Sequence, residues 1–145
     1  MATQGVQPII VGVDGSPSSL AALDWAARQG ALTHEPLLVL MTWEWPRDLG
    51  WAPPVPENYD PAADAQHVLD EAVQAARAAH PDAEIRGSVT ESRAAASLVE
   101  ASRGASLLVV GSRGHGGFGG MLLGSVSQHC VTNAHCPVVV IRDRD

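Results

Sequence analysis

Lysine is absent from this chain. All nine of its basic residues are arginines, and they stand against 16 acidic residues, so the formal net charge is −7. The absence excludes the GxxxxGK[ST] phosphate loop, in which lysine is obligatory, and it excludes Schiff-base chemistry on a lysine amine. The acidic balance argues against general nucleic-acid binding, because phosphate backbones are bound by a basic surface. We therefore expect no nucleic-acid partner.

Long apolar runs and cysteines are also scarce. No apolar run reaches the ~18 residues that a membrane-spanning helix needs. The opening residues MATQGVQPII lack the basic, apolar and cleavage regions of a signal peptide. We therefore expect a cytoplasmic protein without a membrane partner, in which Cys130 and Cys136 are free thiols. Each cysteine follows a histidine, His129 or His135, but this spacing matches no common zinc site, so packed thiols are favoured.

The chain does contain a regular alternation of short apolar runs with longer, alanine-rich stretches. This alternation is typical of an α/β fold with a mostly parallel sheet. A length of 145 residues suits one domain, 1–145, with a single core. The predicted strands start near Ile9, Leu37, Ile85, Ser106 and Pro137, and helices are predicted from Pro17, Pro61, Ala94 and Ser125.

Local signals add detail to the first helix. Ser16 is placed as its N-cap and Pro17 as its first helical residue, and the helix is predicted to run to about Gly30. We expect its apolar side chains to be buried, namely Leu20, Leu23, Ala27 and Ala31.

The last predicted strand is apolar throughout, although the end of a chain often lies at the edge of a sheet. An open apolar edge favours pairing with another chain. We therefore predict a homodimer formed through Val138–Ile141.

Seven of the 14 glycines fall within residues 111–127, GSRGHGGFGGMLLGSVS, directly after a predicted strand. Within this segment, Gly114–Gly119 matches the dinucleotide fingerprint GxGxxG. That fingerprint belongs after the first strand and needs an acidic residue about 20 positions later. Here it follows the fourth strand, and the next acidic residue is Asp143. The dinucleotide interpretation is therefore disfavoured, while a flexible surface loop without a ligand remains an alternative.

An anion site is the interpretation that uses both ends of this segment. Gly111 and Gly124 let the backbone come close to a ligand. The helix that starts at Ser125 presents unpaired N–H groups and the positive end of its dipole. Ser125 and Ser127 add hydroxyl donors, and Arg113 offers a planar guanidinium suited to phosphate.

Three segments of the chain together resemble the universal stress protein family. The spacing Gly111-x2-Gly114-x9-Gly124-Ser125 is similar to the family's ATP-binding motif, G-2x-G-9x-G(S/T). The opening segment 10–16, IVGVDGS, resembles its first strand and turn, and the segment 134–140, AHCPVVV, resembles its closing strand. Because the segments occur in order and at matching distances, the resemblance is specific, and it covers nearly the whole chain.

The resemblance implies an open five-stranded parallel sheet in the order 3-2-1-4-5, with helices on both faces and a nucleotide between strands 1 and 4. It places Asp14 beside the ribose or its Mg²⁺ ion, and it implies dimers through the last strand. The chain departs from the family at Glu91–Ala94, which replaces the Gly-x-Pro often found after the third strand. The other implied contacts are Gly12, Val13 and Thr42 for adenine, Gly111, Arg113 and Gly114 for ribose and phosphates, and Gly124, Ser125, Val126 and Ser127 for phosphates.

The function implied by the resemblance is binding of ATP, or of AMP or ADP in its place, together with Mg²⁺, in a nucleotide-linked regulatory or stress-response module. At most slow ATP hydrolysis is expected, because phosphoryl transfer needs a positioned nucleophile and strong charge stabilisation. Two alternatives stay open. A related adenine-nucleotide α-hydrolase would carry an SGGxDS-like loop or a HIGH-like motif near the first strand, and Val13–Pro17 is neither. A ligand-free interaction module of the same fold is disfavoured by the intact glycine spacing.

Overall fold

A single parallel sheet organises the chain. A computed structural model describes residues 6–44, 57–113 and 123–142. Within these residues, five strands form one sheet in the order β3-β2-β1-β4-β5, and every neighbouring pair is parallel. The predicted class and strand order are confirmed. The strands are β1 (Ile9–Gly12), β2 (Leu37–Trp43), β3 (Ile85–Glu91), β4 (Leu107–Gly111) and β5 (Val138–Ile141).

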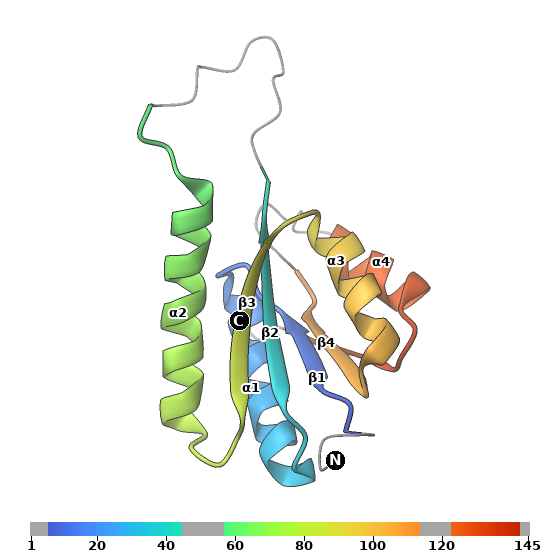
Figure 1. Ribbon diagram of the computed structural model, residues 1–145. Coiled ribbons are helices and arrows are strands. Elements are labelled where there is room, and N and C mark those ends of the chain that lie inside the picture. The colour runs from blue at the N-terminus through green and yellow to red at the C-terminus, as the bar shows by residue number, and fades with distance from the viewer. Residues whose placement is uncertain (1–5, 45–56, 114–122, 143–145) are drawn as a thin grey trace.

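Helices connect the strands and cover both faces of the sheet. Figure 1 shows α3 and α4 together on one side of the sheet, with α1 and α2 on the other. Crossover helices of this kind are what parallel strands require. The helices are α1 (Pro17–Thr33), α2 (Pro61–Ala79), α3 (Ala94–Ala101) and α4 (Ser125–Asn133), and a 3₁₀ turn, η1 (Ser102–Gly104), follows α3.

Side-chain caps set the starts of α1 and α2. Ser16 Oγ accepts a hydrogen bond from the Ser19 amide at 3.2 Å, and Asp60 Oδ1 accepts one from the Ala63 amide at 3.0 Å. In both helices a proline follows the cap, at a position where its missing N–H would have had no helical partner. The starts predicted for these helices are confirmed.

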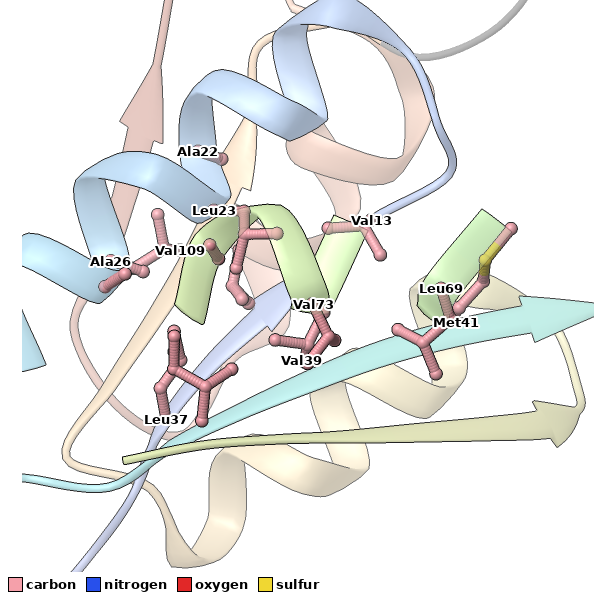
Figure 2. Close-up of a cluster of buried hydrophobic side chains, with 14 of the residues drawn as sticks. Val13, Ala22, Leu23, Ala26, Leu37, Val39, Met41, Leu69, Val73 and Val109 are labelled. Atoms are coloured by element: carbon pink, nitrogen blue, oxygen red, sulfur yellow. The ribbon is translucent and has the colours of Figure 1, made fainter. Parts of the chain in front are cut away.

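The larger core lies between the sheet and the helix pair α1 and α2. Figure 2 shows Leu23 and Ala26 of α1 and Val73 of α2 beside strand residues such as Val39 and Val109. All of these side chains are buried. Because alanine side chains are small, the alanine-rich sequences of α1 and α2 let both helices approach the sheet closely.

The smaller core lies on the opposite face, under α3 and α4. Ile10, Leu108 and Val110 point to this side and pack with Leu98 of α3 and Cys130 of α4. Because β1 and β4 contribute buried residues to both cores, their sequences are apolar without alternation. Both edge strands differ from this: β3 buries only Ile85, and every residue of β5 is half-buried.

Helix α1 departs from the sequence prediction in two ways. It continues to Thr33, with Gly30 inside it, where a Cβ would stand only 2.9 Å from the Glu35 carbonyl oxygen. Gly30 is thus needed for packing and does not end the helix. Leu20, expected in the core, is 42% exposed, because it lines an open groove between α1 and α2. Ala31 is also only half-buried.

Two predicted absences can be compared with the described residues. Across residues 6–44, 57–113 and 123–142, no helix is both long and apolar enough to cross a membrane. Cys130 and Cys136 are free thiols, and these same stretches hold no cluster of three or more histidine, cysteine or acidic side chains that could bind a metal ion.

The two thiols should react differently. Cys130 is fully buried, and burial raises the pKa of its thiol to about 11. Cys136 is half-buried just before β5, and burial also raises its thiol pKa. Since the thiolate is the reactive form, iodoacetamide near pH ~8 should modify native Cys136 slowly and leave Cys130 unmodified until the protein is denatured. Peptide mass mapping follows both sites, and modification of native Cys130 at the rate of Cys136 would contradict this packing.

Candidate functional site

The carboxyl ends of β1 and β4 form the point where the strand order changes direction. The chain leaves β1 through α1 toward β2 on one side, whereas β4 and β5 lie on the other side of β1. In open parallel sheets, ligands bind outside the carboxyl ends of the strands at this switch point. Most predicted site residues end or follow β1 or β4, whereas Thr42 lies near the carboxyl end of β2.

The turn between β1 and α1 holds Asp14 in a defined position. Its Oδ1 accepts a hydrogen bond from the Ser16 amide at 2.9 Å, and its own amide donates to Ser19 Oγ at 3.2 Å. Gly15 has a φ of 85°, a conformation that other residues rarely adopt. This turn fixes a carboxylate at the end of the central strand, where a ligand or its counter-ion would lie.

Gly12, Val13 and Thr42 lie near this turn but present different groups. The Val13 side chain is buried in the larger core, and its amide donates to the Leu40 carbonyl at 3.0 Å. Any contact of Val13 with a ligand would therefore come from its backbone. Gly12 and Thr42 belong to the alternate face of the sheet. A Cβ on Gly12 would stand 2.7 Å from Leu98 Cδ1, so this glycine makes room for α3.

Gly111 ends β4 and packs against the first turn of α1. A Cβ at this position would lie 2.5 Å from Ser18 Oγ and 2.7 Å from the Ser18 carbonyl carbon and oxygen. Two residues later, the Arg113 amide donates to Ser18 Oγ at 3.3 Å. The Arg113 side chain, which carries the guanidinium, therefore starts from a backbone position that a hydrogen bond to Ser18 holds in place. The sequence predicts close approach of a ligand at Gly111, and the structure shows that the first turn of α1 approaches this glycine closely. The ligand contact stays a prediction.

The N-terminus of α4 lies next to this strand end and carries no side-chain cap. Gly124 is the N-cap, with φ −72° and ψ 168°, and the first turn contains no acidic residue. The first helical bond runs from the Gln128 amide to the Gly124 carbonyl at 3.0 Å. The amides of Ser125 and Val126 precede that bond and have no intrahelical acceptor. This end of the helix is suited to bind an anion.

The two serines of this turn differ in what their hydroxyl groups do. Ser125 is exposed. Ser127 is buried, and its Oγ donates to the Ser112 carbonyl at 3.2 Å and lies 3.0 Å from the Gly124 carbonyl. The Gly124 amide also donates to the Ser112 carbonyl, at 2.6 Å. The hydroxyl of Ser127 therefore ties the start of α4 to the exit from β4, and Ser125 is the better placed of the two to contact a ligand.

Gly114, the remaining predicted site residue, lies outside the described residues. Sequence reasoning missed one residue that matters here, Ser18, which contacts both Gly111 and Arg113. A small residue in the first turn of the first helix, opposite a glycine at a strand end, is the signal that could have identified it.

The architecture and the candidate site together define an open α/β protein in which an uncapped helix N-terminus lies at the switch point of the sheet. A sequence model described as the Universal stress protein family matches residues 5–142. The chain is 35% identical over 138 residues to a universal stress protein of Mycolicibacterium smegmatis, and 37% identical over 158 residues to the universal stress protein Rv2623 of Mycobacterium tuberculosis. The chain belongs to the universal stress protein family.

These curated relatives are longer than the present chain. Each alignment covers 94% of this chain but only 46% of the Mycolicibacterium smegmatis protein and 48% of Rv2623. The chain thus spans about half the length of the curated relatives it matches.

Solved structures agree with the fold. A universal stress protein crystallised in complex with cAMP has a TM-score of 0.72 and 29% identity, covering 96% of this chain and 98% of that one. The universal stress protein UspA from Lactobacillus plantarum has a TM-score of 0.76 at 20% identity, covering 94% and 98%. The second comparison bears on the fold alone.

The packing of Gly111 predicts a cost in stability that is independent of any ligand. Gly111→Ala should lower the free energy of unfolding by about 1–3 kcal/mol, because the new Cβ meets the backbone of Ser18, which cannot rotate away. Gly104→Ala is the matched control, since a Cβ there meets nothing within 4 Å. Urea unfolding without nucleotide measures both, and equal midpoints for the two variants would contradict this account of Gly111.

Proposed function

We propose that this protein binds ATP, as the Mg²⁺ complex, at the carboxyl edge of the sheet between β1 and β4, with AMP or ADP as alternative occupants. The observation that supports the proposal best is the uncapped N-terminus of α4, which has no acidic residue in its first turn. The universal stress protein that matches at 29% identity was crystallised with cAMP, an adenine nucleotide, which supports this class of ligand.

The phosphates would be met by backbone dipoles and one cation. The amides of Ser125 and Val126 and the exposed Ser125 hydroxyl are the donors at α4. Gly124 would lie beside the phosphates without donating to them, because its amide donates to the Ser112 carbonyl. Arg113 supplies the positive charge, because the chain contains no lysine. Ser127 contributes indirectly, through its hydrogen bond to the Ser112 carbonyl. Gly111 and Gly114 flank Arg113 in the sequence, and we propose that both lie at the edge of the phosphate site.

Asp14 would stand beside the ribose or the Mg²⁺ ion. Its Oδ1 is oriented by the Ser16 amide, and a carboxylate is the ligand type that Mg²⁺ prefers when phosphates fill the remaining positions. The adenine would lie over the ends of β1 and β2, near Gly12, Thr42 and the backbone of Val13. Mg²⁺ would neutralise phosphate charge that a single arginine leaves uncompensated.

The same reasoning favours a regulatory role over efficient turnover. The described residues of this edge offer Arg113 and backbone donors for charge stabilisation, and Asp14 is held by the turn that contains it. Fast phosphoryl transfer needs a positioned base as well. We therefore propose a cytoplasmic, single-domain (1–145), nucleotide-linked stress-response module in which ATP hydrolysis is slow at most.

A homodimer through β5 completes the proposal. The carbonyls of Pro137 and Ile141 accept hydrogen bonds from the Leu108 and Ser112 amides of the β4 side. Since peptide groups alternate in direction along a strand, the N–H and C=O groups of Val138 and Val140 point to the open edge. Each residue of this strand is also half-buried and apolar, which gives a second copy a surface to cover.

Nucleotide binding can be separated from folding by one charge on α4. Ser125→Glu should favour the helix, because an acidic residue in the first turn suits the helix dipole, yet it should weaken Mg-ATP binding by at least about tenfold, or ~1.4 kcal/mol, through repulsion of phosphate. Gln128→Glu is the matched control, with the same added charge one turn further along an exposed part of α4. Its affinity should stay within about threefold of wild type, because the dipole effect falls off after the first turn.

Isothermal titration calorimetry with ATP, with and without Mg²⁺, measures these affinities, and mass spectrometry of the denatured protein identifies any co-purified nucleotide. Equal affinity for ATP in wild type and Ser125→Glu would place the site elsewhere. Absence of any adenine-nucleotide binding by the wild type would favour the ligand-free interaction module instead.

The dimer has its own test. Wild type should sediment as a dimer at micromolar concentration. Val140→Pro should shift the equilibrium toward monomer, because it removes an outward N–H while sparing the bonds to β4. Circular dichroism checks that the variant is folded. A monomeric wild type, or a folded Val140→Pro variant that remains dimeric, would refute pairing through this strand.

A further inference from the structure

A groove of about 720 Å³ separates α1 from α2 on the face of the sheet opposite α3 and α4. Its apolar walls include Leu20 and Leu23 of α1 and Val68 of α2, and alanines at positions 72, 75 and 79 line it along α2. Leu20 is 42% exposed here. The proposed nucleotide site involves the edge of the sheet, whereas this groove runs along the two helices and meets that edge at Asp14 and Gly15.

The shape of the groove suits a helix. Its lining on α2 extends from Val68 to Ala79, a stretch of about 18 Å at ~1.5 Å per residue. That length accepts about three turns of a second helix laid alongside. At the alanine positions this wall has no side-chain atom beyond Cβ, so a helix backbone can approach closely there, and larger apolar side chains of the incoming helix can fill the volume.

The charges around the groove have one sign. Asp14, Asp24 and Glu71 line it, and none of the other lining residues within the described parts of the chain is charged. Two of these acids also have partners outside the lining: Arg28 Nη2 lies 3.4 Å from Asp24 Oδ2, and His67 Nε2 lies 2.8 Å from Glu71 Oε1.

At one end of the groove, a contact between a histidine and a carboxylate joins the two helices. His80, which caps α2, contacts Asp24 of α1 at 2.7 Å. The pair holds the C-terminal end of α2 against α1, and the rest of the groove stays open between the helices. The occupant should therefore enter along the exposed length of the helices and carry positive charge at its flanks.

From these features we infer that the groove between α1 and α2 docks an amphipathic helix of a partner protein, about three turns long, with an apolar face and basic flanking residues. The leucines and valine of the groove contact the apolar face, and the acidic rim binds the flanks. Apolar anchors at positions i, i+3 or i+4, and i+7 are the usual basis of helix-in-groove recognition. This inference does not depend on nucleotide binding.

The test uses synthetic helices as probes. The first is a fluorescein-labelled peptide of about 14 residues, with leucines on one face and arginines on its flanks, long enough to cover the groove. The second has the same composition in an order that removes the apolar face, and the third carries glutamate in place of arginine. Fluorescence anisotropy at low salt should show saturable binding of the first peptide and at least about tenfold weaker binding of the others, a difference of ~1.4 kcal/mol.

Matched variants locate the binding surface. Ala75→Arg places a long cation inside the groove, whereas Ala78→Arg places the same residue on an exposed part of α2 outside it. Arginine is a good helix former, so both variants should fold. Ala75→Arg should lower the affinity for the first peptide by about tenfold or more. Ala78→Arg should keep that affinity within about twofold of wild type.

Neutralising one acid tests the charge argument in the same way. Glu71→Gln should weaken the first peptide more than Asp70→Asn does, because only Glu71 lines the groove, and the difference should shrink as salt is added. Failure of the first peptide to bind, equal binding of the glutamate peptide, or equal affinity of Ala75→Arg and Ala78→Arg would each overturn the inference. A wild-type dimer that dissociates in Ala75→Arg but not in Ala78→Arg would assign the groove to a second copy of this chain, and it too would overturn the inference.

Discussion

The first turn of α1 holds together the two strand ends that make the site. Ser18 Oγ accepts a hydrogen bond from the Arg113 amide just after β4 ends. The backbone of Ser18 lies against Gly111, which has no Cβ to keep it away. One residue further along α1, Ser19 Oγ accepts a hydrogen bond from the Asp14 amide, which follows β1. A single helical turn thus sets the distance between the carboxylate on one strand and the start of the glycine-rich segment on the other. A shift of this turn would move both halves of the site together.

The helices on the two faces of the sheet pack with different closeness. On the α3 side, Leu98 packs directly over Gly12, where a Cβ would stand 2.7 Å from Leu98 Cδ1. On the other side, α1 and α2 meet at the His80–Asp24 pair, and an open groove lies between them beside Leu20. The close packing brings α3 against the end of β1, next to the candidate site. The open face leaves an apolar and acidic surface that the fold itself does not use.

Much of the fold could be predicted from local sequence signals. Serine followed by proline correctly marked the start of α1, and the predicted start of α2 at Pro61 and the positions of the five strands also agree with the structure. Strand order came from the family resemblance, since local patterns do not contain it. The prediction failed at Leu20, whose exposure depends on the groove between two helices. It also failed at Gly30, which lies inside the helix and is needed there because a Cβ would stand 2.9 Å from the Glu35 carbonyl oxygen. Neither property is visible in the sequence periodicity of α1.

The candidate site was predictable in outline for the same reason. Asp14 and the helix start at Ser125 are read from short segments. The contact of Ser18 with Arg113 joins residues 95 positions apart, and the engagement of Ser127 with the Ser112 carbonyl depends on how α4 returns to β4. These contacts decide which groups face outward and which are used inside the protein, so the division of labour between Ser125 and Ser127 could not be predicted.

The place of Gly111 also bears on how sequence motifs in this family are read. The packing of α1 against β4 requires glycine at this position whether or not a ligand is bound, because a Cβ there would meet the backbone of Ser18. The first glycine of the motif is therefore explained by the fold and is not by itself evidence for a ligand. Evidence for a retained ligand rests with positions that the fold leaves free to vary, and the exposed Ser125 at the start of α4 is the clearest of them.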